Sequence, residues 1–160
     1  MSAQLVIPDT NALSELRQRD CHPNVARFVA SVERFAIAAT TITEIAHGVE
    51  LLRQRGGAAA HQRAAVYAVW LDELIKRGPV LPLDANASRL FGRLLTVPEL
   101  RNMAITAPGS SRPRYPGDLA VAAVAVVNSA SVATRNISDF WRIARHCPEL
   151  VVHNPFDPPV

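Results

Sequence analysis

Short apolar runs alternate along the chain with longer segments whose apolar residues recur at helical spacing. The short runs predict five strands, at 4–7, 34–39, 80–83, 131–133 and 150–152. The helical segments follow Asp9 and Thr41, cover 61–77, 86–97 and 119–127, and end with one from about Asp139. Strands that alternate with helices form stacked βα units. The pattern therefore predicts an α/β fold with a mostly parallel sheet of four to five strands.

One predicted helix differs from the others in its polarity. Residues 119–127 have almost no polar face, which indicates burial between other elements. The stretch just before it, 97–117, is rich in proline and glycine and cannot be regular throughout. We expect a loop insertion there, either a solvated surface loop or a lid over a substrate. Residues 1–160 show no repeat or linker, so we expect a single domain.

Composition excludes several classes of protein. With 49% hydrophobic and 19% charged residues the chain is globular, and its two cysteines are too few for a disulfide framework or a zinc site. No apolar run approaches the roughly 18 residues of a membrane span, so we expect a cytoplasmic protein with no membrane association. All but one of the 17 basic residues are arginine, a good phosphate ligand. That bias favours nucleic acid only weakly, since a GC-rich genome produces it too.

Four acidic residues stand at corresponding places beside the predicted elements. Asp9 follows the first strand, Glu44 lies one turn after the second, Asp118 starts the apolar helix and Asp139 follows the fourth strand. The carboxyl ends of parallel strands share one edge, where such folds bind ligands. Carboxylates about 4 Å apart repel by roughly 4 kcal/mol per pair, so a cluster needs protons or a cation. Oxygen ligands select Mg²⁺ or Mn²⁺, ions that bind phosphates and activate water for phosphodiester hydrolysis.

Each acid also has a purely structural interpretation. Asp9 is a candidate helix cap, and the run from Thr41 to Glu44 spells a capping box, in which the glutamate reaches back to the cap amide. Asp118 and Asp139 also stand where caps are common, and Asp84 is expected to be a cap alone. The functional interpretation depends on the four acids meeting at one sheet edge.

Five segments carry a family resemblance. They read VIPDTNALSEL at 6–16, ITEIAHGVELL at 42–52, DLAVAAVAV at 118–126, ATRNISDF at 133–140 and NPF at 154–156. In this order and spacing they resemble the motifs of PIN domains of the VapC toxin group. The resemblance covers most of the chain. Pro8 departs from it, because an apolar strand residue is usual directly before the first aspartate.

The resemblance implies a three-layer α/β/α PIN-like domain and a metal-dependent endoribonuclease with Mg²⁺, or Mn²⁺, as cofactor. It implies a catalytic metal site formed by Asp9, Glu44, Asp118 and Asp139, supported by Thr134 and Asn136. It further implies a homodimer inhibited by a small cognate antitoxin, with the toxin–antitoxin complex binding promoter DNA through the antitoxin. Three arginines, Arg112, Arg114 and Arg135, are candidates for holding the RNA backbone.

Two other functions stay open at this point. A phosphatase of the haloacid dehalogenase type also places an aspartate after its first strand, but it needs a second one two residues on, where this chain has Asn11. A non-catalytic PIN-like module that binds RNA or a partner would not need all four acids. The chain has no Walker loop, GxGxxG, CxxC, GxSxG or HExxH motif.

Overall fold

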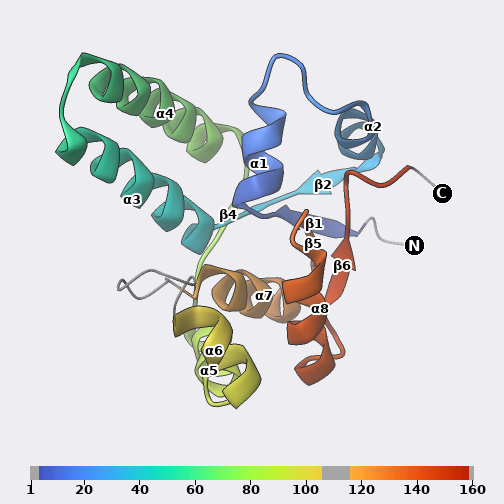
Figure 1. Cartoon of the computed structure of the whole chain (residues 1–160). Coiled ribbons are helices and arrows are strands. Elements are labelled where there is room, and N and C mark those ends of the chain that lie inside the picture. Colours follow the sequence, from blue (N-terminus) through green and yellow to red (C-terminus); the bar gives the residue numbers. More distant parts are fainter. Residues whose placement is uncertain (1–3, 106–115, 159–160) are drawn as a thin grey trace.

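The computed structural model describes residues 4–105 and 116–158 (Figure 1). The strands of this part are β1 (Leu5–Pro8), β2 (Arg34–Phe35), β3 (Ile37–Ala38), β4 (Val80–Leu81), β5 (Ser131–Ala133) and β6 (Val151–His153). The helices are α1 (Thr10–Leu16), α2 (Pro23–Ser31), α3 (Ala39–Arg55), α4 (Ala58–Arg77), α5 (Ala85–Leu95), α6 (Pro98–Ile105), α7 (Gly117–Val127) and α8 (Ile137–His146).

The central sheet is parallel, with strand order β2-β1-β5-β6. A second parallel pair, β3-β4, continues it, because β2 and β3 belong to one extended segment. Between them, the Ala36 amide donates to the Val6 carbonyl (3.0 Å), and the Ile37 amide donates to the Pro79 carbonyl (2.9 Å). The carboxyl ends of β1, β3 and β5 therefore lie along one edge of a continuous array, as expected for a parallel fold.

The two middle strands of the four-stranded sheet, β1 and β5, are almost completely buried. In β5 every residue is buried, and in β1 only Leu5 is partly exposed. Burial of both faces is usual for parallel strands that have helices on either side. The sheet is thus a rigid base for the residues that follow β1 and β5, namely Asp9 and Thr134.

Helices cover both faces of the sheet and give the three-layer α/β/α arrangement (Figure 1). On one face, α5, α7 and α8 form the larger core, which includes Leu94, Leu119 and Phe140. On the other, α1, α3 and α4 pack around a smaller core that includes Leu13 and Ile45. In α7, residues 119–125 are all buried, which confirms the prediction made from its apolar sequence.

Most expected elements are present, with three differences. The strand expected at 34–39 is two short strands, β2 and β3, which pair with different neighbours. No helix was expected at 23–31, where α2 lies. The first part of the stretch expected as a loop, 97–117, forms α6, and its residues 106–115 lie outside the described part. Within residues 4–105 and 116–158, none of the helices combines the length and apolarity needed to cross a membrane.

Candidate functional site

Asp9 continues directly from β1 and is almost completely buried, with 4% of its surface exposed. Its backbone amide donates to the carbonyl of Ala133 at the end of β5 (2.9 Å). Its Oδ1 accepts from the amide of Ala12 (2.7 Å), so Asp9 is the N-cap of α1. Its Oδ2 accepts from the hydroxyl of Thr134 (2.5 Å). The capping interpretation of Asp9 is therefore correct, but it accounts for only one of the two carboxylate oxygens.

The pKa of the Asp9 carboxyl is raised above its ordinary value of 3.8. Burial is the main cause, because it disfavours the charged form, and repulsion by Glu44 acts in the same direction. The hydrogen bonds from Thr134 and from the Ala12 amide oppose this rise and do not cancel it. Asp9 is thus a buried acid in the field of a second acid, an environment that a bound cation would relieve.

Thr134 and Asn136 link Asp9 to two further acids. The Thr134 hydroxyl is completely buried and accepts from the Asn136 backbone amide (2.8 Å). The Asn136 side-chain amide donates to Asp118 Oδ2 (3.1 Å) and to Asp139 Oδ2 (2.8 Å). One amide group therefore holds two carboxylates together, and the residues that the resemblance named as supporting the site do contact its acids.

Asp118 and Asp139 are both in the first turn of a helix, in α7 and α8 respectively. Neither is the cap, since the N-cap positions are Pro116 and Asn136. The partial positive charge of two helix N-termini stabilises the two carboxylates. Arg142, one turn further along α8, is 3.6 Å from Asp139 and adds a partly exposed ion pair.

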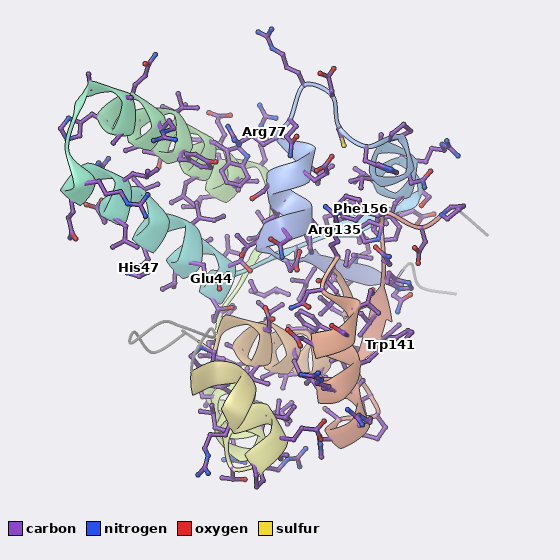
Figure 2. All side chains as sticks on the ribbon, viewed as in Figure 1. Glu44, His47, Arg77, Arg135, Trp141 and Phe156 are labelled. Atoms are coloured by element: carbon purple, nitrogen blue, oxygen red, sulfur yellow. The ribbon has the colours of Figure 1, made fainter. Side chains whose placement is uncertain are left out.

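Glu44 is not part of a capping box. Helix α3 begins at Ala39, with Ala38 at the N-cap position, so Thr41 lies inside its first turn. The buried Thr41 hydroxyl has no hydrogen-bond partner within the described residues. The Glu44 carboxylate instead accepts from the hydroxyl of Thr10, the residue that follows Asp9. Figure 2 shows Glu44 near the end of α3 that lies beside α1 and the sheet.

Asp84 behaves as the sequence predicts. Its Oδ1 accepts from the Ala87 amide (2.8 Å) and caps α5, the same contact that Asp9 makes with α1. No contact joins Asp84 to the four acids among the interactions of the described residues. It is a structural cap and a natural control for Asp9.

The four acids thus form a connected series of contacts rather than a compact cage. Within the described ranges, no three His, Cys, Asp or Glu side chains form a group that could hold a metal ion. Mg²⁺, however, usually binds one or two protein carboxylates and keeps several waters. The donor set is all oxygen, and two carboxylates meet at the Asn136 amide. These residues fit a hydrated Mg²⁺ or Mn²⁺ and do not fit a fully protein-ligated ion.

Two grooves flank α1 and reach these acids. One, of about 520 Å³, is lined by Asn136 and Asp139 together with Ser14, Arg135 and Phe156. The other, of about 290 Å³, has Glu44 and Thr10 at one end and continues as a mostly apolar groove between α3 and α4. The acids are therefore accessible from two sides of α1.

Of the three candidate arginines, Arg135 is exposed and lines the larger groove, whereas Arg112 and Arg114 lie outside the described residues. Two contributors were missed from the sequence. Thr10 holds Glu44, and the signal was its place beside Asp9 in the first motif. Phe156 lies under Arg135, and the signal was its place in the NPF segment.

Comparison with known proteins places the fold. No family model matches the sequence, and no curated protein matches it closely. Among solved structures, VapBC-1 from nontypeable Haemophilus influenzae is similar, with a TM-score of 0.65 and 17% identity over 96% of this chain and 99% of the other. FitAcB from Neisseria gonorrhoeae has a TM-score of 0.64 and 23% identity over 94% and 98%.

A third similar structure is VapBC-5 from Mycobacterium tuberculosis, described as a member of the VapBC family of toxin–antitoxin systems. Its TM-score is 0.59, with 22% identity over 93% of this chain and 97% of the other. The matches cover nearly the full length on both sides, so the likeness extends to the whole fold. It confirms, for the fold, the resemblance carried by the five sequence motifs. The chain has the PIN-like α/β/α fold found in VapBC toxin–antitoxin complexes.

Proposed function

We propose that this protein is a Mg²⁺-dependent endoribonuclease and the toxin of a toxin–antitoxin pair. The observation that carries the proposal is the Asn136 amide held between Asp118 and Asp139, with Thr134 connecting it to the buried Asp9. These contacts join residues from three elements at the carboxyl edge of the sheet. A merely structural set of helix caps would not need them, because Asp118 and Asp139 cap no helix.

Each residue has a distinct part in this proposal. Asp118 and Asp139 hold the cation. When the cation is absent, the Asn136 amide keeps the two carboxylates at a fixed separation. Asp9 contributes a carboxylate whose orientation is fixed by Thr134 and by the Ala12 amide. Glu44, held by Thr10, approaches from the opposite side of α1 and adds negative charge beside Asp9.

When bound, the ion supplies Lewis-acid chemistry: it lowers the pKa of water and stabilises the leaving oxygen of the phosphodiester. The protein's own residues position that ion. No side chain needs to form a covalent bond with the RNA, and within the described residues no Ser–His–acid or Cys–His arrangement lies among these contacts. Among the described residues, the acids concentrate negative charge at this sheet edge, which suits such a reaction.

The proposed partners follow from the similar structures. VapBC2 from Rickettsia felis is described as bound to a DNA fragment from its promoter, and VapBC from Salmonella typhimurium as DNA bound. By analogy, a small antitoxin would inhibit this chain, and the complex would bind promoter DNA through the antitoxin. The resemblance further suggests a homodimer, and sedimentation of the purified chain measures that state.

The test uses antitoxin-free protein and labelled RNA in Mg²⁺, with EDTA as the metal-free condition. The wild type should cut the RNA in Mg²⁺ or Mn²⁺ and stop in EDTA. Asp118→Asn should be inactive, while Asp84→Asn, which replaces a cap of similar geometry outside the site, should remain active. Binding of RNA without any metal-dependent cleavage would instead identify a non-catalytic module and overturn the proposal.

A further inference from the structure

Arg135 stands between two residues of the proposed site and lines the same groove as Asn136 and Asp139. Its neighbours Thr134 and Asn136 contact the acids, while Arg135 is exposed. Its guanidinium carbon lies over the ring of Phe156, 5.0 Å from the ring centroid. Figure 2 shows this labelled pair between α1 and α2. A flat cationic group is thus held against an aromatic face directly beside the acids.

The ring under Arg135 is fixed before any ligand arrives. The Phe156 amide donates to the Asn154 side chain (3.1 Å), and its carbonyl accepts from Asn24 of α2 (2.8 Å). The His22 ring contacts it at 5.7 Å with a tilt of 53°, so His22 is not stacked on a face of the phenyl ring. Since the Phe156 backbone is already held and its ring already contacts His22 and Arg135, little conformational entropy is lost when a ligand stacks on this pair.

The groove beside the pair suits an unpaired base better than a phosphate. Its α1 wall presents the polar side chains of Asn11, Ser14 and Gln18, which can hydrogen-bond to base edges. Of its two acids, Asp139 belongs to the proposed metal site, and Glu15 would repel a phosphate that entered the rest of the groove. Its volume of about 520 Å³ lies in the range of small-ligand pockets.

We infer that Arg135 and Phe156 form a stacking platform for one unpaired base of the RNA, next to the cleaved phosphate. The inference rests on the proposed ribonuclease function and specifies its substrate as single-stranded at this position. The base stacks on the outer face of the Arg135 guanidinium, and Phe156 is a positioning residue that holds this planar group in place. A double-stranded RNA, whose bases are already paired and stacked, cannot use the platform.

The test measures each protein variant both with an intact RNA and with RNAs that lack a single base. A set of single-stranded RNAs carries one abasic site at each successive position. Cleavage is measured as kcat/KM with the wild type, and binding is measured by fluorescence anisotropy with the Asp118→Asn protein. One abasic position should lower both by about tenfold, the scale expected for one stacked base. Arg135→Lys keeps the positive charge and loses the planar guanidinium. It should lower cleavage and binding of the intact RNA by a similar factor, and the abasic site should then have no further effect.

Phe156→Leu should also lose sensitivity to the abasic site, whereas Phe156→Tyr, which keeps an aromatic ring, should retain it. A general folding defect would not produce this difference between the two variants. Matched controls are Trp141→Ala, an exposed aromatic on α8 away from the pair (Figure 2), and Arg55→Ala at the end of α3. Both controls should behave as wild type. Equal abasic sensitivity in wild type, Arg135→Lys and Phe156→Leu would overturn the platform. If the wild type does not cleave RNA at all, the proposed function is wrong. The binding measurements with the same variants and RNAs would still test the stacking platform.

Discussion

The two oxygens of Asp9 make separable contributions, which substitution can distinguish. In Asp9→Ala, α1 loses its N-cap contact with Ala12, at a cost of about 1 kcal/mol. The buried Thr134 hydroxyl also loses its acceptor, which costs roughly 1 to 2 kcal/mol more. For a chain of this size each kcal/mol lowers Tm by about 2 to 4 °C, so a fall of roughly 5 to 10 °C is expected.

Asp9→Asn should behave differently, because asparagine is an equally good N-cap and keeps the Oδ1 acceptor. Its side-chain NH2 replaces Oδ2 and can donate to the Thr134 oxygen, so this contact remains a hydrogen bond with its direction reversed. In the wild type, the raised pKa of Asp9 means that its protonated form is favoured by the fold. That stability is present below the ordinary pKa of 3.8 and is lost as the pH rises through the raised folded value. The asparagine variant lacks this loss, so its stability relative to the wild type should increase from acid to neutral pH.

The assay is thermal unfolding in EDTA across this pH range, for wild type, Asp9→Asn, Asp9→Ala and the cap control Asp84→Asn. At neutral pH, Asp9→Asn should melt at or above the wild type and yet be inactive as a nuclease. A fall in Tm as large as that of Asp9→Ala, with a gap that widens towards neutral pH, would refute the reasoning. It would mean that the ionised carboxylate stabilises the fold and that its pKa is lowered.

Three further changes test individual contacts. Glu44→Gln keeps an acceptor for the Thr10 hydroxyl, so unfolding should be unchanged while Mg²⁺-dependent cleavage falls; full activity would remove Glu44 from the site. Asn136→Ala removes the amide that contacts both carboxylates, so activity should need more Mg²⁺; an unchanged Mg²⁺ titration would contradict its positioning role. Thr41→Val replaces a buried hydroxyl that lacks a partner in the described part, so chemical denaturation should show equal or greater stability, by up to about 1 kcal/mol. A clear loss of stability would instead support the interpretation of Thr41 as the cap of a capping box.

The sequence predicted the sheet better than it predicted the helices around it. Apolar runs at β1 and β5 could be located because both strands are buried on both faces. The two missed helices, α2 and α6, share one feature: each begins with a proline, Pro23 and Pro98. Proline indicates a break inside a helix but is favourable in its first turn, where the amide has no partner to lose. Local pattern alone does not separate these two roles.

The acids could be predicted as a group, whereas their partners could not. All four were expected at one sheet edge, because three of them follow predicted strands and the carboxyl ends of parallel strands share one edge. The capping box at Glu44 failed because α3 starts at Ala39, before the expected threonine cap. The true partner, Thr10, is 34 residues away in sequence. Such a contact depends on how α1 packs beside α3, and no local spacing encodes it.

The account as a whole depends on one cation being held by acids from different elements. The most direct measurement is a crystal structure of the protein with Mn²⁺, in which anomalous scattering locates the ion. The account predicts a single strong peak between Asp118 and Asp139, on the side of Asp9, with oxygens of these two carboxylates at about 2 Å and waters completing the shell. A saturated crystal with Mn²⁺ bound elsewhere, and with the Asn136 amide still joining Asp118 to Asp139, would contradict it.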